Sequence, residues 1–263
     1  MVGDAITDEY CYVTPFGMAG KENILSCQYE RTESFEGGVV AASRHILDFC
    51  ADVQISCGPE YVVKRRFVEE AYTRKLFSVQ YSGLGIDCYK GNYEDFDLVV
   101  VTDFGHGFVT DQMINEISER AKFLAVNCQT NSANRGFNLI TKYQRADYVV
   151  IDGLEARLAA QDRRSSIEYV IGKLKFPKIV VTQGAHGAVG YDGEFHYSSA
   201  VSNKVVDTMG AGDAFFCVTA PFACAGASMP ELLAIGNAAG AIKCGAVGQI
   251  AVDKESLCRT IAA

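Results

Sequence analysis

Four short apolar runs limit what this chain can fold into more than any other feature of its sequence. They are residues 96–102, 123–127, 146–151 and 178–182, and each is followed by polar or glycine residues. Runs of this length, rich in valine and isoleucine, are typical of buried strands. The segments between them include helical patterns such as 111–120. Strands that alternate with helices predict an α/β fold with a mainly parallel central sheet.

Other segments predict antiparallel strands and further helices. We expect strands at 10–14 and 24–29, a strand pair at 62–68 and 73–80, a hairpin at 188–197, a helix from Gly37-Gly38 to about Cys50, and a helix at 229–245. Alternation along 62–68 places Lys64 and Arg66 on one face of the sheet. That face suits the phosphate group of a bound ligand, although charges on a strand are also typical of a protected sheet edge.

The stretch 205–216 carries the clearest chemical signal. Val205 and Val206 are interpreted as the end of a strand, and a buried helix is predicted to start near Gly212. Glycines let backbone N–H groups converge, and a helix N-terminus adds a partial positive charge, so the segment suits a phosphoryl group. Asp213, at the start of this helix, is placed to take the proton of an attacking hydroxyl. An ordinary turn with a helix-capping aspartate is the alternative.

Composition excludes several other classes of protein. The net charge of −8, without a long basic tract, argues against general nucleic-acid binding. The sequence has neither an apolar run of ~18 residues, as a membrane span needs, nor a signal-peptide pattern. Its ten cysteines form no CxxC pair, which favours thiols in a reducing cytoplasm over a zinc site or disulfides. We therefore expect one cytoplasmic domain covering residues 1–263, with no nucleic-acid or membrane partner.

The segment Asp207-Thr208-Met209-Gly210-Ala211-Gly212-Asp213 resembles the Asp-Thr-x-Gly-Ala-Gly-Asp signature of the ribokinase (PfkB) family of carbohydrate kinases. The resemblance implies a ribokinase-like three-layer sandwich with a small β-sheet lid, here from about 10–36 and 62–81. It implies that Asp213 is the catalytic base, that residues 210–212 form an anion hole, and that Asp207 and Thr208 lie at the nucleotide. ATP and Mg²⁺ are the implied cofactors, with K⁺ as an optional further cation.

The resemblance also implies a set of acceptor-binding residues. Asp8 matches the last residue of a Gly-Asp-x-x-x-Asp motif that binds sugar hydroxyls, and Gly37 and Gly38 match a pair that lies against the substrate. Asp103 ends a strand, so it is expected to face the cleft. Its turn resembles that of heptose-phosphate kinases, with His106 in place of a lysine. Ala41 stands where the family usually has an asparagine, which removes a sugar contact.

The nucleotide side is implied by four further segments. Asp152 and Glu155 match an Asn-x-x-Glu pair that organises Mg²⁺, although two acids at a helix start also serve as caps. Thr182, Gly184 and Gly187 belong to a turn that resembles a nucleotide-binding turn. Asn237 and Gly248 match positions near the adenine and a monovalent cation. The loop 129–135 is interpreted either as a reader of substrate hydroxyls or as a surface loop.

The function expected from this resemblance is transfer of a phosphoryl group from ATP to a hydroxyl of a sugar or sugar phosphate. The resemblance is strongest to the kinase half of bifunctional heptose-7-phosphate kinase/nucleotidyltransferase proteins, which implies a nucleotidyltransferase partner domain. It also implies a homodimer formed through the lid. The chain is expected to be a shortened member, because 58–61 replaces a helix and a strand. Almost no strand precedes Asp4, which suggests a chain cut from a longer polypeptide or an unusual start. The alternatives are a nucleoside or vitamin kinase and a non-catalytic nucleotide- or sugar-binding scaffold.

Overall fold

The computed structural model of the protein describes residues 1–58, 62–72, 74–82, 91–134, 136–201, 205–245 and 250–262. Its body is built on an eight-stranded sheet with the order β12-β11-β10-β9-β8-β7-β1-β4. The six strands from β4 to β10 run parallel, and β11 and β12 form an antiparallel hairpin at one edge. The strands are β1 (Val2–Gly3), β4 (Ser56–Cys57), β7 (Val99–Asp103), β8 (Leu124–Cys128), β9 (Tyr148–Asp152), β10 (Ile179–Thr182), β11 (Ala188–Tyr191) and β12 (Phe195–Ser198).

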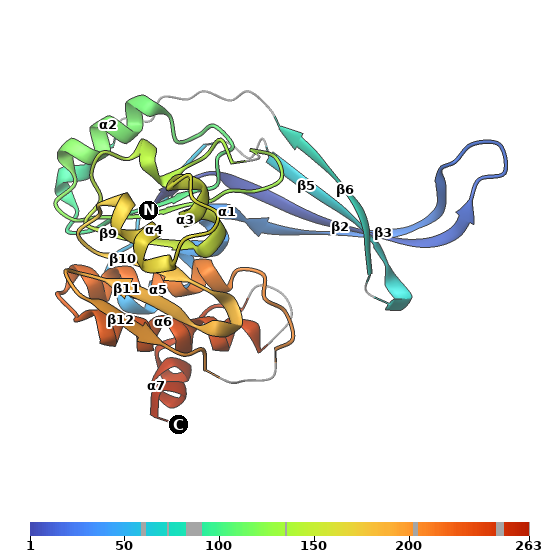
Figure 1. The fold of residues 1–263 in the computed structure, drawn as a ribbon. Helices are drawn as coiled ribbons and strands as arrows, with labels where there is room; N and C mark the ends of the chain where they lie inside the picture. Colours follow the sequence, from blue (N-terminus) through green and yellow to red (C-terminus); the bar gives the residue numbers. More distant parts are fainter. Residues whose placement is uncertain are drawn as a thin grey trace.

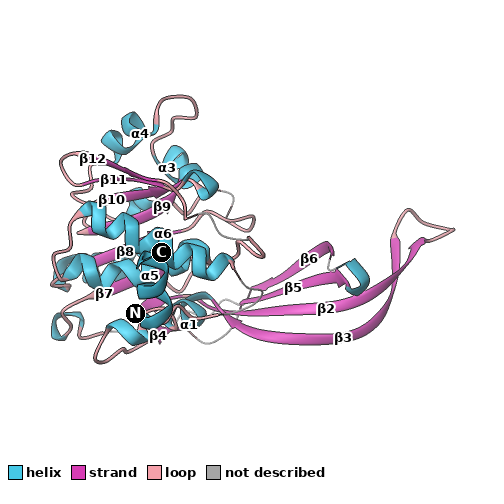
Figure 2. Ribbon diagram, turned by 90° about the horizontal axis from the view of Figure 1, so that it is seen from below, coloured by secondary structure: helices cyan, strands magenta, loops and turns pink. Residues whose placement is uncertain are grey.

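Helices cover both faces of this sheet and make three layers (Figures 1 and 2). Successive strand residues point to opposite faces, so Val101 packs against one helical layer and Val100 against the other. The first layer holds α2 (Asp111–Arg120), α3 (Gly153–Ala159) and α4 (Ile167–Leu174). The second holds α1 (Gly38–Ser43), α5 (Ala211–Cys224) and α6 (Met229–Cys244), with α7 (Lys254–Ala262) packed on α6.

A separate four-stranded sheet, the lid, projects from one side of the body (Figure 1). Its order is β3-β2-β5-β6, with β2 (Ala5–Met18), β3 (Leu25–Gly37), β5 (Val62–Glu69) and β6 (Arg74–Ser82). The pairing of β2 with β5 ends at Val13 and Glu69, whereas its pairing with β3 continues to Met18 and Leu25. The β2–β3 hairpin therefore reaches beyond the other two strands as a two-stranded arm.

The predicted ribokinase-like sandwich with a β-sheet lid is confirmed, and the helix predicted at 111–120 is found at those residues. Two local predictions are wrong. The helix expected from Gly37-Gly38 to Cys50 ends at Ser43, and a 3₁₀ turn at Leu47–Phe49 follows it. Val205 and Val206 are not a strand, because the N–H of Val206 bonds to the Cys244 carbonyl at the end of α6.

The first strand is as short as the sequence indicates, since β1 has two residues between β4 and β7. The shortened segment near 58 falls partly outside the described residues, which exclude 59–61. Among the helices described, none is both long and apolar enough to cross a bilayer.

Candidate active site

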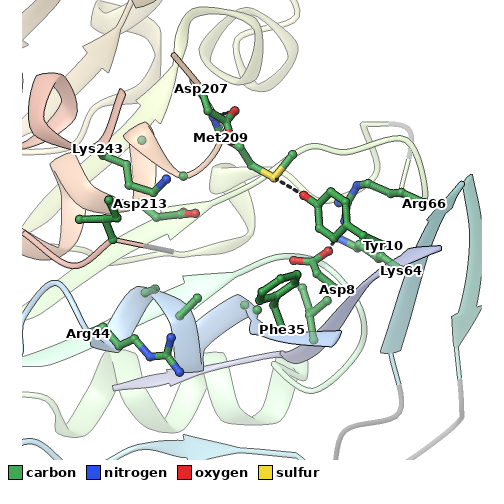
Figure 3. A pocket seen from close by; sticks show the side chains of 18 of the residues that line it. Asp8, Tyr10, Phe35, Arg44, Lys64, Arg66, Asp207, Met209, Asp213 and Lys243 are labelled. Carbon is green, nitrogen blue, oxygen red and sulfur yellow. Dashed lines mark hydrogen bonds and ion pairs between the residues drawn. The ribbon is translucent and has the colours of Figure 1, made fainter. Parts of the chain in front are cut away.

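A cavity of about 700 Å³ lies where the lid meets the N-terminus of α5 (Figure 3). The lid contributes one wall and the α5 and α6 helices contribute another. Among its lining residues are the predicted site residues Asp8, Gly37, Gly38, Lys64, Arg66, Asp207, Gly210, Gly212 and Asp213. The cavity therefore brings together most of the predicted acceptor-binding residues and the predicted base.

The α5 helix starts with an open N-terminus at this cavity. Gly210 occupies its N-cap position with a φ of 77°, a left-handed conformation that favours glycine. No side chain caps the helix in the part of the chain that the structure describes. The Ala211 N–H donates to the Thr208 carbonyl at 3.3 Å, which leaves the following amides of the first turn for a ligand. This arrangement is a suitable anion site.

Asp213 receives a hydrogen bond from a residue whose role the sequence left open. The Gln129 Nε2 atom donates to Asp213 Oδ1 at 2.6 Å. The backbone of Gln129 is itself fixed, because its N–H donates to the Asp103 carbonyl at 2.8 Å and its carbonyl accepts from Asn134 and Asn138. The loop 129–134 thus places an amide against the predicted base.

The environment of Asp213 suits a general base. Burial raises the pKa of Asp213 to about 6, although the Gln129 hydrogen bond and the charges of Lys64 and Lys243 act in the opposite direction. Efficient general bases have pKa values close to the working pH. At neutral pH this carboxylate is mostly ionised and still accepts a proton readily.

Charged residues of the lid face Asp213 across the cavity. Arg66 forms a close ion pair with Asp8, and the Tyr10 hydroxyl reaches the Met209 sulfur at 3.8 Å (Figure 3). Burial lowers the pKa of Lys64, and the charge of Asp8 partly offsets this effect. The residues described provide no ion-pair partner within 4.0 Å of the Lys64 ammonium group. Asp8, Lys64 and Arg66 therefore lie on the lid side of the cavity, and Glu33 and Lys75 of the lid also belong to its lining.

Gly37 and Gly38 allow the backbone to approach closely at the root of the lid. A Cβ atom on Gly37 would lie 2.7 Å from Asp8 Oδ2, and one on Gly38 would collide with the Asp4 carbonyl. Asp4 is 2% exposed, and its carboxylate accepts from the N–H groups of Phe104, His106 and Phe108. Asp4 therefore holds the 103–108 turn against the start of β2.

Asp103 does not line the cavity, contrary to the expectation that it faces the cleft. It is 1% exposed, forms an ion pair with Lys142 at 2.6 Å and accepts from the Tyr143 hydroxyl at 2.7 Å. Asn138 also donates to it, at 3.0 Å. Phe104 lines the cavity in its place. The carboxylate at the end of β7 is thus used to fix the loop that carries Gln129.

Asp152 and Glu155 form the capping box of α3, so the capping alternative describes their observed contacts. The Asp152 Oδ1 atom accepts from the Glu155 N–H at 2.7 Å, and Glu155 Oε2 accepts from the Asp152 N–H at 2.8 Å. Glu155 Oε1 accepts from the Thr130 N–H at 2.9 Å. Burial, with a smaller effect of the Asp152 charge, raises the pKa of Glu155 to about 7. Their role in holding a metal ion stays a prediction.

Of the predicted nucleotide-binding residues that the structure describes, Asp207 lines the cavity, whereas Thr182, Gly184, Gly187, Thr208 and Asn237 do not. Thr182 ends β10 in register with Asp152 of β9, so both occupy the same sheet edge. Gly184 and Gly187 follow in a tight turn against β12. Asn237 donates to the Ser198 hydroxyl at 3.0 Å and to the Ser199 carbonyl at 3.1 Å, which fixes the end of β12 to α6. Gly248 lies outside the described residues, and Thr208 and Ala211 do not line the cavity.

Sequence analysis missed Lys243, which lines the cavity beside Gly210 and is only 5% exposed. It also missed the Tyr10–Met209 contact between the lid and residues 205–210 before α5, here called the α5 loop. Lys243 is the lone charged residue of the 232–244 segment, and this signal could have identified it, since a buried lysine needs an anionic partner.

Curated relatives include proteins named "Bifunctional protein HldE". The one from Ectopseudomonas mendocina (strain ymp) is 27% identical over 172 residues, which are 62% of this chain and 35% of the relative. The one from Rhodopseudomonas palustris (strain BisB5) is 26% identical over 216 residues, 75% of this chain and 44% of the relative. The chain therefore spans less than half the length of these relatives.

Solved structures with the same fold cover nearly the whole chain. A ribokinase from Thermotoga maritima gives a TM-score of 0.76 at 15% identity, covering 100% of this chain and 99% of its own. The Arabidopsis thaliana ribokinase complexed with ribose and ATP gives a TM-score of 0.75 at 14% identity, covering 99% of this chain and 97% of its own. Phosphofructokinase-2 from Escherichia coli, in complex with potassium, gives a TM-score of 0.69 at 13% identity, covering 100% of this chain and 98% of its own. At these identities the likeness establishes the fold alone.

The family profile described as "pfkB family carbohydrate kinase" matches residues 88–256, which are more than half of the chain. The match includes the α5 loop, Asp213 and Lys243, and the relatives and the fold agree with it. The chain belongs to the pfkB family of carbohydrate kinases.

Proposed function

We propose that this protein transfers the γ-phosphoryl group of ATP to a hydroxyl group of a sugar phosphate. The observation that carries the proposal is the position of Asp213 at the open N-terminus of α5, facing a cavity whose opposite wall holds Asp8, Lys64 and Arg66. A base, an anion site and an enclosed space for an acceptor are thus combined. Residues 1–263 act in this proposal as one kinase domain.

In the proposed reaction the acceptor lies between the lid and α5. Its hydroxyl donates to the Asp213 carboxylate, which takes the proton as the acceptor oxygen bonds to the γ-phosphorus atom and ADP leaves. The backbone N–H groups of residues 210–212 hold the transferred group. Gly212 makes the largest contribution, because the Ala211 N–H already donates to the Thr208 carbonyl. Asp8 and the backbone at Gly37 and Gly38 hold the other hydroxyls of the acceptor.

The residues present fit the nucleotide and its metal ion. The open amides of α5 suit the phosphates, and Mg²⁺ commonly takes one or two carboxylates and keeps several waters. Asp152 and Glu155 would supply those carboxylates, because each oxygen used in the capping box retains a lone pair. Mg²⁺ bound there would neutralise charge on the phosphates. Thr182, Gly184, Gly187, Asp207, Thr208 and Asn237 would line the path of the nucleotide, with Gly248 and K⁺ expected beyond its base.

The charges of the lid favour a phosphorylated acceptor over a nucleoside or a vitamin. Lys64 and Arg66 both face the cavity, and Lys75 and Arg44 lie on its lining. Lys64 is partly buried without a close ion-pair partner among the described residues, a costly state that an anionic ligand relieves. Lysine and arginine are the usual ligands of phosphate groups.

Two features of the lid also support assembly with a second copy of this chain. The arm formed by β2 and β3 carries Phe16, Met18 and Ile24 with exposed fractions of 71%, 60% and 53%. Two-stranded hairpins are only marginally stable in water, so a covered arm is favoured. We propose a homodimer paired through the lid, which light scattering coupled to size-exclusion chromatography tests. A nucleotidyltransferase partner domain, as implied by the resemblance, completes the proposed assembly.

The experiment that tests the function is a phosphotransfer assay with ATP and Mg²⁺ over a panel of sugars, sugar phosphates, nucleosides and vitamins. ADP release is measured, and the product is identified by mass spectrometry. We expect transfer to a sugar phosphate. Transfer to nucleosides alone contradicts the proposed acceptor class. If no acceptor is phosphorylated and calorimetry detects no binding of ATP, the scaffold alternative replaces the kinase.

A further inference from the structure

Lys243 is buried at the point where the α5 loop meets the end of α6. It is 5% exposed, and no other lysine in the described part of the chain is buried as deeply. Its side chain lines the cavity together with Gly210, Gly212 and Asp213. Figure 3 shows the Lys243 side chain beside Asp213, on the wall that faces the lid.

The position of Lys243 is fixed relative to the anion site. A Cβ atom on Gly210 would lie 3.3 Å from Lys243 Cε and 3.9 Å from Lys243 Nζ, so the ammonium group lies next to the N-cap of α5. The adjacent Cys244 carbonyl accepts from the N–H groups of Val206 and Asp207, at 2.8 and 3.2 Å. The end of α6 and the segment before the α5 loop are therefore held together.

The charge of Lys243 acts on the predicted base. It favours the ionised form of Asp213, as does Lys64 from β5. The Asp213 charge in turn helps to raise the pKa of the Glu155 carboxyl group of α3. His45, on the α1 side, has its pKa lowered to about 4 by burial and by the Lys243 charge, so it adds no positive charge at neutral pH. The two cations that face Asp213 thus come from opposite walls of the cavity.

A buried ammonium group is costly unless an anion compensates it. Asp213 is one such anion, but it becomes neutral when it takes the acceptor proton. The transferred phosphoryl group then carries the negative charge at the same place. A cation beside the α5 N-terminus stabilises both anions in turn.

We propose that Lys243 is a catalytic residue whose Nζ atom contacts the transferred phosphoryl group. This inference rests on the proposed function. During transfer the acceptor oxygen bonds to the γ-phosphorus atom, the bond to the bridging oxygen of ADP breaks, and the acceptor proton moves to Asp213. Lys243 takes no part in the proton transfer and stabilises the charge on the moving group. It adds a point charge to the amides of α5.

The test compares Lys243→Met and Lys243→Ala with the wild type and with Lys178→Met. Lys178 is a matched control, because its half-buried ammonium group donates to the Ala227 carbonyl away from the cavity. We expect Lys243→Met to lower kcat about 10²- to 10³-fold, as loss of one charge-stabilising donor does. Its melting temperature should stay equal or rise, since an apolar replacement of a buried charge is often neutral or stabilising.

Chemical rescue separates catalysis from a structural role. The Lys243→Ala variant leaves space for a small cation, so ammonium or methylammonium chloride should restore part of its kcat, whereas sodium chloride at equal ionic strength should not. A Lys243→Met variant with wild-type kcat overturns this inference and leaves the proposed function intact. Loss of kcat with a lowered melting temperature and no rescue also overturns it. Wild-type protein that phosphorylates no acceptor overturns the proposed function together with this inference.

Discussion

The two walls of the cavity are held in place by different forces. The α5 wall is part of the core, where Ala214, Phe215 and Phe216 directly follow Asp213 and are buried. The lid wall is a sheet that projects from the body and is held at its cavity face by the Asp8–Arg66 ion pair. A packed helix keeps a catalytic group in one position, whereas a projecting sheet with charged residues permits variation of the acceptor. Under the proposed function, this difference assigns the chemistry to α5 and the choice of acceptor to the lid.

The largest expected effect on activity comes from a substitution in the α5 wall. Asp213→Asn should lower kcat by about 10²- to 10⁴-fold, because the amide accepts no proton from the acceptor. The affinity for ATP with Mg²⁺, measured by calorimetry, should change little. The variant should be no less stable than the wild type, since the raised pKa of Asp213 means that its charged form is disfavoured in the folded state.

Asp111→Asn provides the matched control, because Asp111 lies in the first turn of α2 on the protein surface. It should keep the wild-type rate. Equal turnover in the wild type and Asp213→Asn would remove Asp213 from the mechanism and, with it, the division of roles between the two walls.

The next effect tests the lid wall. Lys64→Met should raise KM for a phosphorylated acceptor about 10- to 100-fold, the effect of losing one charge-assisted contact of roughly 1.5–3 kcal/mol. It should leave kcat at saturating acceptor nearly unchanged, since the base and the anion site are intact. Steady-state kinetics with the exposed Lys122→Met variant as control measures this. A fall in kcat with unchanged KM would place Lys64 in the chemical step instead.

The smallest effect concerns the loop between the walls. The Gln129 hydrogen bond favours ionised Asp213, so Gln129→Leu should raise the pKa of Asp213 further. Because the base must be ionised, activity falls as pH falls through that pKa, which is about 6 in the wild type. The acid limb of the kcat profile should therefore move to higher pH in Gln129→Leu.

Gln112→Leu, on the surface of α2, serves as the control for this shift. An acid limb that stays at the wild-type pH in Gln129→Leu would assign Gln129 to loop structure alone. Glu155, whose pKa is about 7, also titrates in this range, so the comparison rests on the difference between the variants and not on the absolute position of the limb.

The sequence predicted the body of the fold because its strands are buried on both faces and read as continuous apolar runs, as in 146–151. It predicted that a helix starts near Gly212 because small residues there precede a long apolar run, and α5 does start beside the cavity. The role of Asp213 rests on the resemblance to a family signature and stays a prediction. The lengths of β2 and β3 were not predictable, since mixed polar and aromatic residues do not reveal where a twisted arm ends. The burial of Asp103 and the approach of Lys243 depend on partners far away in the sequence, Lys142 and Gly210, which local patterns do not contain.

Asp4 also fixes the place where the lid leaves the body. It is bonded to the 103–108 turn, its carbonyl accepts from the Val39 N–H at 3.0 Å, and Ala5 bridges to Gly38. The start of β2 and the end of β3 consequently leave the body side by side along a single crease. The lid should then tilt as one plate about this crease when an acceptor enters, so its cationic residues would approach Asp213 together.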